Sequence, residues 1–372
     1  MSRSIPVLTY HMVRPAGPVT PDMFEHHLQW LARSGYRTID SEELYQHLTE
    51  KKVIAGPAVQ ITFDDGWLDN WIYAYPLLKK YGLKATIFVI TDRIQNQKQP
   101  ERANLEDIWH RRAAEADLPQ LKSPQEIFFD GIKAGGRWDD FLSWSEIKTM
   151  VQSGHIEIQS HSHTHAYHFT GSKVIDFNRL RHWKIAWATA GDFRLGIPEY
   201  EGASSLTAPR YYDSEKIRDL LAAEAMRVGA SEWLKQKNAK RKFQRAFRLF
   251  YDSIDDTLKK MGTYENEQVF RERGLTELQL SRKLIATHTA TECSFLCWPW
   301  GEYSPDSLSM ARQAGFSGTY TLDRGSNKPG DPAETIRRFE IRPNNMLWFA
   351  SRILLYSHPL LASVYYKLHH RF

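Results

Sequence analysis

Cysteine is nearly absent from this chain, since only Cys293 and Cys297 occur among its 372 residues. Two thiols cannot build a disulfide framework, and their place beside Trp298 favours two buried thiols at a strand end over a redox or metal pair. Long apolar runs are also missing: no stretch of about eighteen apolar residues occurs, so no membrane-spanning helix is expected. The first apolar run is too short and too early for a signal peptide. We therefore expect a cytoplasmic protein.

The composition has no excess of charge of one sign. Hydrophobic residues make up 42% and charged residues 25%, and the formal net charge is +5, values that are ordinary for a folded soluble protein. The length allows one large domain or two ordinary ones. No nucleic-acid recognition motif accompanies the basic residues, so a nucleic-acid partner is not expected.

Strand and helix signals alternate through most of the chain. Short apolar runs predict strands, and apolar residues at helical spacing or capping residues predict the helices between them. The predicted strands are 6–10, 36–39, 58–63, 85–90, 156–158, 295–298 and 318–321, and the predicted helices are 21–34, one from Ser41, 69–81, one from Ser143, and 304–315. Such a repeat indicates an α/β fold with a parallel sheet or barrel, whose chemistry lies at the C-terminal ends of the strands.

The alternation is interrupted twice. Residues 93–140 are polar and aromatic without a clear period and are interpreted as an inserted loop region with one or two short helices. Residues 167–280 are interpreted as a mostly helical insertion. The predicted organisation is therefore a first part of the α/β domain over 1–166, the insertion over 167–280, a last part over 281–345, and an amphipathic tail over 346–372.

Two adjacent carboxylates follow the predicted strand 58–63. The run is Thr62-Phe63-Asp64-Asp65-Gly66. Adjacent residues leaving a strand point in different directions, so Asp64 and Asp65 are not expected to bind a metal equivalently. One can bind a divalent ion while the other accepts a proton from water.

A histidine cluster, His161-Ser162-His163-Thr164-His165, follows the predicted strand 156–158. If the strand continued, His161, His163 and His165 would share a face. If the chain turns after His161, then His161 and His165 come together and His163 points away. A site with few protein ligands leaves positions for water and substrate, which is typical of a hydrolytic metal rather than a structural one.

These two motifs resemble those of the polysaccharide deacetylases, carbohydrate esterase family four, which share the NodB homology domain. The Thr-Phe-Asp-Asp-Gly run and the His-Ser-x-x-His run resemble the first and second motifs of that family. The opening run Leu8-Thr9-Tyr10-His11 and residues 81–89 resemble its bacterial exopolysaccharide-type members. The resemblance covers about 5–165 and 280–345 and leaves out the middle insertion.

The resemblance implies a fold, a reaction and roles for single residues. The fold would be a NodB-like distorted (β/α) barrel with fewer than eight units. The reaction would be metal-dependent hydrolysis of an N-acetyl group on an amino sugar. Asp64 would be the general base, and Asp65, His161 and His165 would bind a divalent metal ion, Zn²⁺ or a similar one.

Two family features are altered in this chain. The third motif usually has an arginine ahead of its proline to orient the base, whereas the counterpart here is Cys297-Trp298-Pro299-Trp300-Gly301. Arg338 is our substitute candidate, the alternative being a solvated arginine at a strand end. The late Leu-x-His motif, which supplies the general acid, has only a loose match in residues 355–358. His11 is another candidate for the acid, the alternative being a buried structural histidine.

Aromatic and basic residues suggest two kinds of surface. Trp298 and Trp300 flank Pro299 and could bind a sugar ring, with Trp300 favoured as the exposed one. The basic stretch 233–250 and the tail 347–372 combine aromatic, apolar and cationic residues, which is typical of helices at a membrane surface. The alternative for the tail is a helix packed on the barrel.

The sequence therefore supports three hypotheses. The first is an amino-sugar deacetylase in surface-polysaccharide biosynthesis, acting on a lipid-linked or nucleotide-linked precursor in the cytoplasm or at the inner face of the membrane. The second is removal of another acyl group, or hydrolysis of a non-sugar amide, at the same site. The third is a catalytically degenerate protein that binds glycans or membranes.

Overall fold

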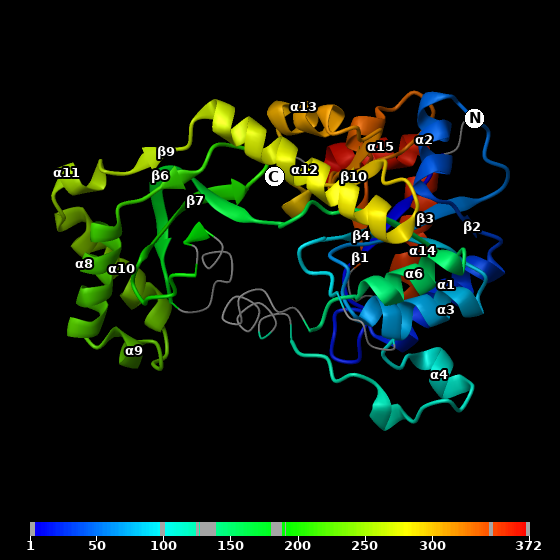
Figure 1. The fold of residues 1–372 in the computed structure, drawn as a ribbon, viewed down its shortest axis with the longest axis horizontal. Helices are drawn as coiled ribbons and strands as arrows, with labels where there is room; N and C mark the ends of the chain where they lie inside the picture. The colour runs from blue at the N-terminus through cyan, green and yellow to red at the C-terminus, as the bar shows by residue number, and fades with distance from the viewer. Residues whose placement is uncertain are drawn as a thin grey trace.

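The computed structural model describes residues 4–96, 101–123, 126, 139–179, 188–189, 191–341 and 345–369. Its described residues form two lobes, with a parallel sheet and its helices on the right of Figure 1 and a smaller lobe on the left. We call residues 167–264 the wing and the larger lobe the barrel. Helix α12 (Glu267–Thr289) leads from the wing back to the barrel.

The barrel is built on a parallel sheet with strand order β11-β10-β5-β4-β3-β1-β12, and β2 pairs with β3. All of these pairings are parallel. The strands are β1 (Val7–Tyr10), β2 (Arg37–Thr38), β3 (Ala58–Phe63), β4 (Ala85–Val89), β5 (Ile156–Ser160), β10 (Phe295–Cys297), β11 (Gly318–Tyr320) and β12 (Phe339–Glu340). The predicted distorted (β/α) barrel of fewer than eight units is confirmed.

Burial on both faces explains why the strands are short apolar runs. Every residue of β1, β3 and β4 is buried, as expected for a parallel sheet whose faces are both covered. The covering helices are α1 (Pro21–Arg33), α2 (Ser41–Thr49), the π-helical turn η1 (Asn70–Ala74), α3 (Tyr75–Lys80), α6 (Trp144–Gln152), α12, α13 (Pro305–Gln313) and α14 (Met346–Ser357). Short helices α4 (Leu105–Trp109) and η2 (Glu115–Asp117) lie in the predicted loop region 93–140, part of which falls outside the described residues.

Local capping chemistry sets the helix starts. The Ser143 hydroxyl accepts a hydrogen bond from the Glu146 N–H, and the Ser143 N–H donates to the Glu146 carboxylate at 2.9 Å, which is a capping box. The helix predicted from Ser41 is capped one residue earlier, because the Asp40 carboxylate accepts from the Glu43 N–H at 2.9 Å. The predicted helix 69–81 consists of η1 followed directly by α3.

The wing contains two antiparallel strand pairs in addition to the helices that were predicted for the insertion. It begins with an antiparallel pair, β6 (Tyr167–Phe177) and β7 (Pro198–Ser204), and also contains β8 (Tyr211–Tyr212) paired with β9 (Thr263–Tyr264). Its helices are α8 (Glu215–Arg227), α9 (Ala230–Trp233), α10 (Ala239–Ser253) and α11 (Asp256–Lys259). Cross-strand and helix–strand aromatic packing, such as Phe169 on Tyr200 at 5.2 Å, stabilises the β6–β7 pair.

The predicted boundary at residue 280 is also wrong, because it falls inside α12. The apolar residues Phe270, Leu278 and Ile285 of α12 are buried in the barrel core. The physical reason is that α12 packs along β5, α6 and α13, so the whole helix belongs to the barrel.

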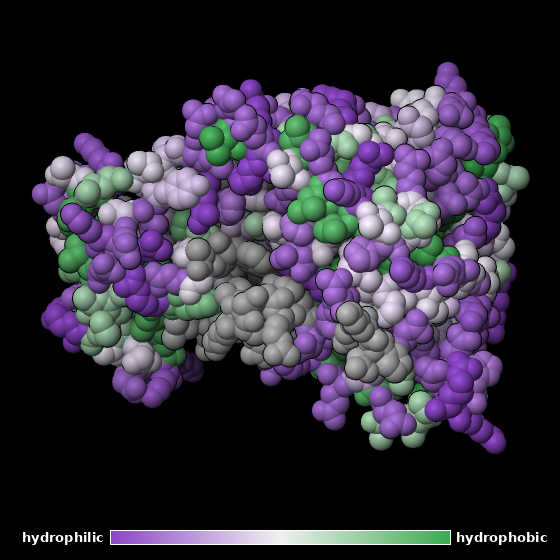
Figure 2. All heavy atoms as spheres, in the orientation of Figure 1, coloured by the Kyte–Doolittle hydropathy of each residue, from purple (hydrophilic) through white to green (hydrophobic). Residues whose placement is uncertain are grey.

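The chain ends in α14 and α15 (Pro359–His369), and residues 370–372 of the predicted tail lie outside the described residues. Among the described helices, none is long and apolar enough to cross a membrane. In the view of Figure 2, polar and charged residues cover most of both lobes, and hydrophobic residues form small separate groups.

Candidate metal site and its buried carboxylate

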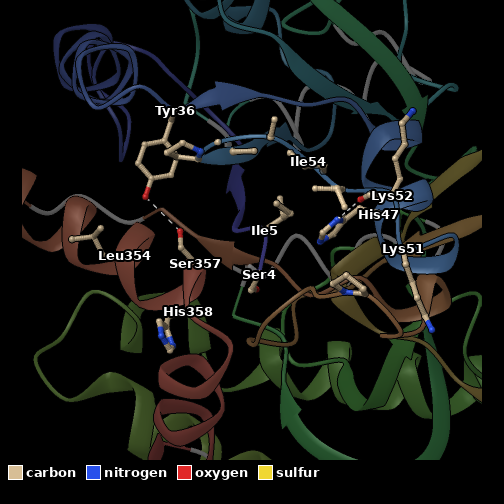
Figure 3. Close-up of a pocket in the computed structure, with 16 residues that line it drawn as sticks. Ser4, Ile5, Tyr36, His47, Lys51, Lys52, Ile54, Leu354, Ser357 and His358 are labelled. Carbon is tan, nitrogen blue, oxygen red and sulfur yellow. Dashed lines mark hydrogen bonds between the residues drawn. The ribbon is translucent and has the colours of Figure 1, made fainter. Parts of the chain in front are cut away.

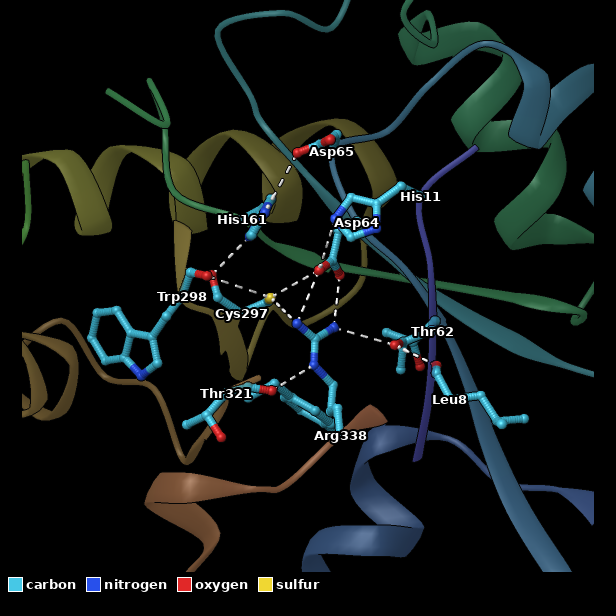
Figure 4. A network of polar contacts seen from close by, with 12 residues as sticks. Leu8, His11, Thr62, Asp64, Asp65, His161, Cys297, Trp298, Thr321 and Arg338 are labelled. Carbon is cyan, nitrogen blue, oxygen red and sulfur yellow. Dashed lines mark hydrogen bonds and ion pairs between the residues drawn. The ribbon is translucent and has the colours of Figure 1, made fainter. Parts of the chain in front are cut away.

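The predicted functional residues gather where parallel strands end. His11 follows β1, Asp64 and Asp65 follow β3, and His161 follows β5. The C-terminal ends of parallel strands meet at one edge of the sheet. Figure 4 shows the resulting cluster, in which these side chains point toward one another.

Asp65 and two histidines form one group. The Asp65 Oδ1 atom lies 3.5 Å from His161 Nε2 and 3.8 Å from His165 Nε2. The other oxygen, Oδ2, accepts a hydrogen bond from Trp67 Nε1 at 2.9 Å, which turns Oδ1 toward the imidazoles. These three ligand atoms all lie within 4.8 Å of one another and can hold a metal ion together.

The histidine motif has the turned arrangement, not the continued strand. Ser162 and His165 both adopt a left-handed backbone, with φ of 65° and 53°, and the Ser162 hydroxyl accepts from the His165 N–H at 3.0 Å. His163 points away from the group, with its Nδ1 2.8 Å from Thr91 Oγ1. The turn is tied to α12, because Thr164 donates to Glu277 from its N–H and its hydroxyl.

His161 and His165 are both in surroundings that favour the neutral imidazole, the form that binds a metal ion. His161 Nδ1 lies 2.9 Å from the Cys297 carbonyl oxygen, so it donates there and leaves the Nε2 lone pair facing Asp65. Burial lowers the pKa of His161 and lowers that of His165 further. Because metal binding requires unprotonated imidazole, this burial favours an ion.

Asp64 is held apart from this group by a buried arginine. Arg338 Nη1 donates to Asp64 Oδ1 at 2.7 Å and Nη2 donates to Oδ2 at 2.9 Å, a bidentate pair (Figure 4). Arg338 is fixed by a further bond from its Nε to the Thr321 carbonyl at 3.0 Å. Burial alone would raise the pKa of Asp64, but the Arg338 charge outweighs it and holds that pKa well below its ordinary value. The predicted alternative of a solvated Arg338 is wrong, because its side chain is fully buried.

Cys297 completes the surroundings of Asp64. Its Sγ atom lies 3.6 Å from Asp64 Oδ2 and 2.9 Å from Arg338 Nη2. Asp64, His161 and Cys297 also lie close enough to form a second metal-binding group. That group is disfavoured, because Arg338 already occupies both Asp64 oxygens and because burial raises the Cys297 pKa, so a thiolate there is costly.

The remaining predicted residues divide between the site and the core. His11 is at the site, with Nε2 3.9 Å from Asp64 Oδ2 and its side chain 32% exposed, so it is not a buried structural histidine. Trp300 lies at the rim, its ring 4.6 Å from the His165 ring and 5.8 Å from Tyr167. Trp298 and Pro299 are buried, which corrects their prediction as sugar-binding residues. The reason is that Trp298 Nε1 donates to Thr319 Oγ1 at 2.9 Å and fixes the ring in the core.

The loose Leu-x-His match at residues 355–358 is wrong as a source of the acid. Ser357 at the end of α14 accepts from the Ser4 N–H at 3.2 Å through its carbonyl, next to the N-terminal end of β1. His358 lines a cleft there with Ser4, Ala58 and Leu354. It therefore lies at the end of the barrel opposite the Asp65 group.

Two supporting residues were not predicted. Trp67 orients Asp65, and its only sequence signal is its place two residues after the carboxylate. Glu277 holds the histidine turn from more than a hundred residues away and gives no local signal.

The donor set of Asp65, His161 and His165 fits a divalent ion. One carboxylate oxygen and two imidazole nitrogens suit Zn²⁺ and several other first-row divalent ions. The orienting bonds to Trp67 and to the Cys297 carbonyl are the outer contacts that metal ligands usually have.

In comparison with known proteins, the segment that contains most of these residues matches a family model. Residues 51–181 match the polysaccharide deacetylase family, and this segment contains Asp64, Asp65, His161 and His165. YxkH of Bacillus subtilis, whose name assigns it provisionally to the polysaccharide deacetylases, is 46% identical over 23% of this chain and 32% of its own length. The poly-β-1,6-N-acetyl-D-glucosamine N-deacetylase of Staphylococcus epidermidis is 29% identical over 33% of this chain and 52% of its own length. The chain thus spans about a third and about half of these two relatives.

Solved structures resemble almost the whole chain in fold. The deacetylase PplD of Streptococcus pyogenes, solved with acetate, has a TM-score of 0.53 and 18% identity, covering 96% of this chain and 100% of its own. A de-N-acetylase from Aggregatibacter actinomycetemcomitans has a TM-score of 0.56 and 17% identity, covering 94% of this chain and 99% of its own. At such identities the likeness shows the fold.

Proposed function

We propose that this chain, whose residues 51–181 match the polysaccharide deacetylase family, acts as a member of that family and removes N-acetyl groups from an amino sugar by metal-dependent hydrolysis. The observation that carries the proposal is the separation of two adjacent carboxylates. Asp65 shares a ligand group with His161 and His165, whereas Asp64 is paired with Arg338 and remains beside that group as a base.

Asp65, His161 and His165 would hold the ion, Zn²⁺ being the candidate. When bound there, a divalent ion would polarise the acetyl carbonyl and lower the pKa of water. Asp64 would accept the proton of the attacking water, and Arg338 would keep the carboxylate ionised and oriented for that transfer. The same pairing weakens Asp64 as a base, so the proton would stay on it only briefly.

His11 is our candidate for the acid that protonates the departing amine. Its Nε2 lies on the accessible side of Asp64, 3.9 Å from the carboxylate, and it follows β1 on the catalytic side. A proton accepted by Asp64 could therefore be passed on within the same site.

The substrate would extend over Trp300 toward the wing. The Trp300 ring is half-buried between His165 and Tyr167, and a flat aromatic face beside the metal ligands suits a sugar ring. The name of the Staphylococcus epidermidis relative suggests a β-1,6-linked N-acetylglucosamine polymer. A lipid-linked or nucleotide-linked precursor of a surface polysaccharide is the narrower proposal, and the cytoplasmic location stays a prediction.

Acetate release from a panel of substrates tests the proposal. The panel contains N-acetylglucosamine oligomers, a lipid-linked and a nucleotide-linked N-acetylhexosamine, and the matching N-formyl and N-propionyl sugars. We expect acetate release that depends on added divalent metal and is lost in His165→Ala. The control is His163→Ala, from the same motif but pointing away. Metal-independent release, or equal loss in both variants, would contradict the proposal.

A further inference from the structure

The C-terminal helices present apolar side chains that nothing in the described part of the chain covers. One residue of the loop 51–57 and four from the second half of α14 and from α15 are each more than half exposed: Val53, Leu354, Leu360, Leu361 and Val364. We call these five residues the apolar face. Exposed apolar groups of this kind mark surfaces that bind something.

The apolar face is not the unpacked core side of a helix. The opposite side of α14 is already in the core, where Phe349, Ile353 and Tyr356 are buried. Phe349 stacks on His27 at 4.0 Å and Tyr356 stacks on Phe339 at 4.5 Å. The helix is therefore held in place with its leucines pointing outward, as an amphipathic helix at an interface would be.

The sequence of the C-terminal segment has charged residues of one sign. Residues 341–372 contain no aspartate or glutamate, and their charged residues are Arg342, Arg352, Lys367 and Arg371. Lys51 and Lys52, on the loop that carries Val53, are exposed. Exposed leucines on a segment without carboxylates, beside two exposed lysines, suit an anionic lipid surface, which supplies both acyl chains and negative headgroups.

A cleft of about 730 Å³ lies between the loop 51–57 and the end of α14. Figure 3 shows the residues that line it. Lys51, Lys52, Val53 and Leu354 line it, so it joins the cationic and apolar parts of the surface. Because the cleft also contains Ser4 and Ala58, at the N-terminal ends of β1 and β3, it lies at the pole opposite the Asp65 group.

The cleft wall offers polar atoms to a headgroup. His47 is buried, and its Nδ1 donates to the Lys52 carbonyl at 2.9 Å (Figure 3). Its Nε2 then has a lone pair with no hydrogen-bond partner among the described residues. The Tyr36 and Ser357 hydroxyls face each other at 3.5 Å on the other wall. A headgroup that carries both hydroxyls and a phosphate matches this combination of an acceptor, hydroxyls and lysines.

We propose that this pole docks on an anionic lipid surface, with the apolar face in the headgroup–acyl boundary and one phosphate-bearing headgroup in the cleft. Asp65, His161 and His165 lie beyond the C-terminal ends of β3 and β5, whereas the cleft lies at the N-terminal ends of β1 and β3. Docking would therefore leave the candidate metal site facing away from the lipid. Hydrolysis of a soluble substrate would therefore be independent of docking.

The basic helix α10 is the competing surface, and the structure disfavours it. Its apolar residues Phe243 and Phe247 are buried in the wing core. Leu249 of α10 is 62% exposed, close to the 67% of Leu360, and it provides a matched control.

Sedimentation with vesicles tests the proposal. We expect the full chain to bind vesicles of phosphatidylcholine with phosphatidylglycerol, but not phosphatidylcholine alone, and to be released by salt. The double variant Leu360→Asn/Leu361→Asn should weaken binding on the order of tenfold. Lys51→Gln/Lys52→Gln should weaken it less, and Leu249→Asn should leave it unchanged. Circular dichroism and release of acetate from a soluble oligomer should match the wild type in every variant.

Three results would overturn the proposal. The first is no binding of the wild type to either vesicle, and the second is an equal or larger loss in Leu249→Asn. The third is a concentration-dependent dimer that the Leu360→Asn/Leu361→Asn change abolishes, because the apolar face would then bind a second copy of the chain. Retained acetate release in any of these cases would leave the proposed function standing.

Discussion

The barrel and the wing are both folded around cores of buried aromatic and aliphatic residues, but they contribute differently to the site. Asp65, His161, His165, Asp64, Arg338 and His11 all come from the barrel, and all but Arg338, which directly precedes β12, follow the end of a strand. The wing contributes Tyr167, which packs against Trp300 at the rim. Under the proposed function, the barrel supplies the chemistry and the wing borders the rim of the site, so damage to the wing and damage to the site should be separable by mutation.

The largest effect should come from the base in the barrel. Asp64→Asn should lower kcat by about 10²- to 10⁴-fold, because the proton acceptor is lost while the bond to Arg338 is partly kept. Acetate release under saturating substrate measures this. A variant with near wild-type kcat would show that another group accepts the proton.

Arg338→Met should lower kcat by about 10²-fold and destabilise the barrel by about 3 to 5 kcal/mol, because it leaves a buried carboxylate unpaired. Burial raises the pKa of Asp64, and the variant loses the Arg338 charge that chiefly opposes this effect. Since the base must be ionised, the acid limb of kcat/KM should move to higher pH. In the wild type, the stabilisation by Asp64 is complete above its ordinary pKa of about 3.9 and is lost only as the pH falls through its depressed value.

The pH profile of kcat/KM and chemical denaturation check this prediction. Arg337→Met is the control, since Arg337 is half-buried and bonds to the Ser326 carbonyl rather than to Asp64. An unchanged acid limb in Arg338→Met would contradict the assigned role.

Phe247→Ala should destabilise the wing and leave the stability of the barrel unchanged. The ring is buried and stacks on Phe243 at 4.3 Å, so its loss should cost about 3 to 5 kcal/mol. Hydrogen exchange should show lost protection in β6, β7 and α10 and retained protection in β3 and β4. Leu249→Ala, on the exposed side of α10, should leave the hydrogen-exchange protection of both lobes unchanged. Loss of protection in both lobes of Phe247→Ala would mean that the lobes fold as one unit.

The smallest effect should come from the rim. Trp300→Ala should raise KM for an oligomeric substrate by about 3- to 10-fold with little change in kcat, as expected for one aromatic contact. Steady-state kinetics on oligomers and on the monomer measure this. An equal fall of kcat on both substrates would place Trp300 in the chemistry instead.

Local sequence patterns predicted the barrel because its elements are specified locally. The strand before Asp64, the capping box at Ser143 and the positions of Asp65, His161 and His165 can all be found within short windows. The β6–β7 pair was missed because it is stabilised by contacts distant in sequence, and α12 was misassigned because its partners are β5 and α6. Arg338 was only a candidate, since its burial against Asp64 joins positions 274 apart. Trp298 and Pro299 were misplaced because a sequence does not show which aromatic faces the core.

Metal content measured on purified protein tests the central claim most directly, namely that Asp65, His161 and His165 bind one ion while Asp64 stays unligated. We predict about one equivalent of a divalent metal in the wild type, in Asp64→Asn and in His163→Ala, and almost none in Asp65→Ala or His165→Ala. Loss of the metal in Asp64→Asn, or its retention in His165→Ala, would contradict the account.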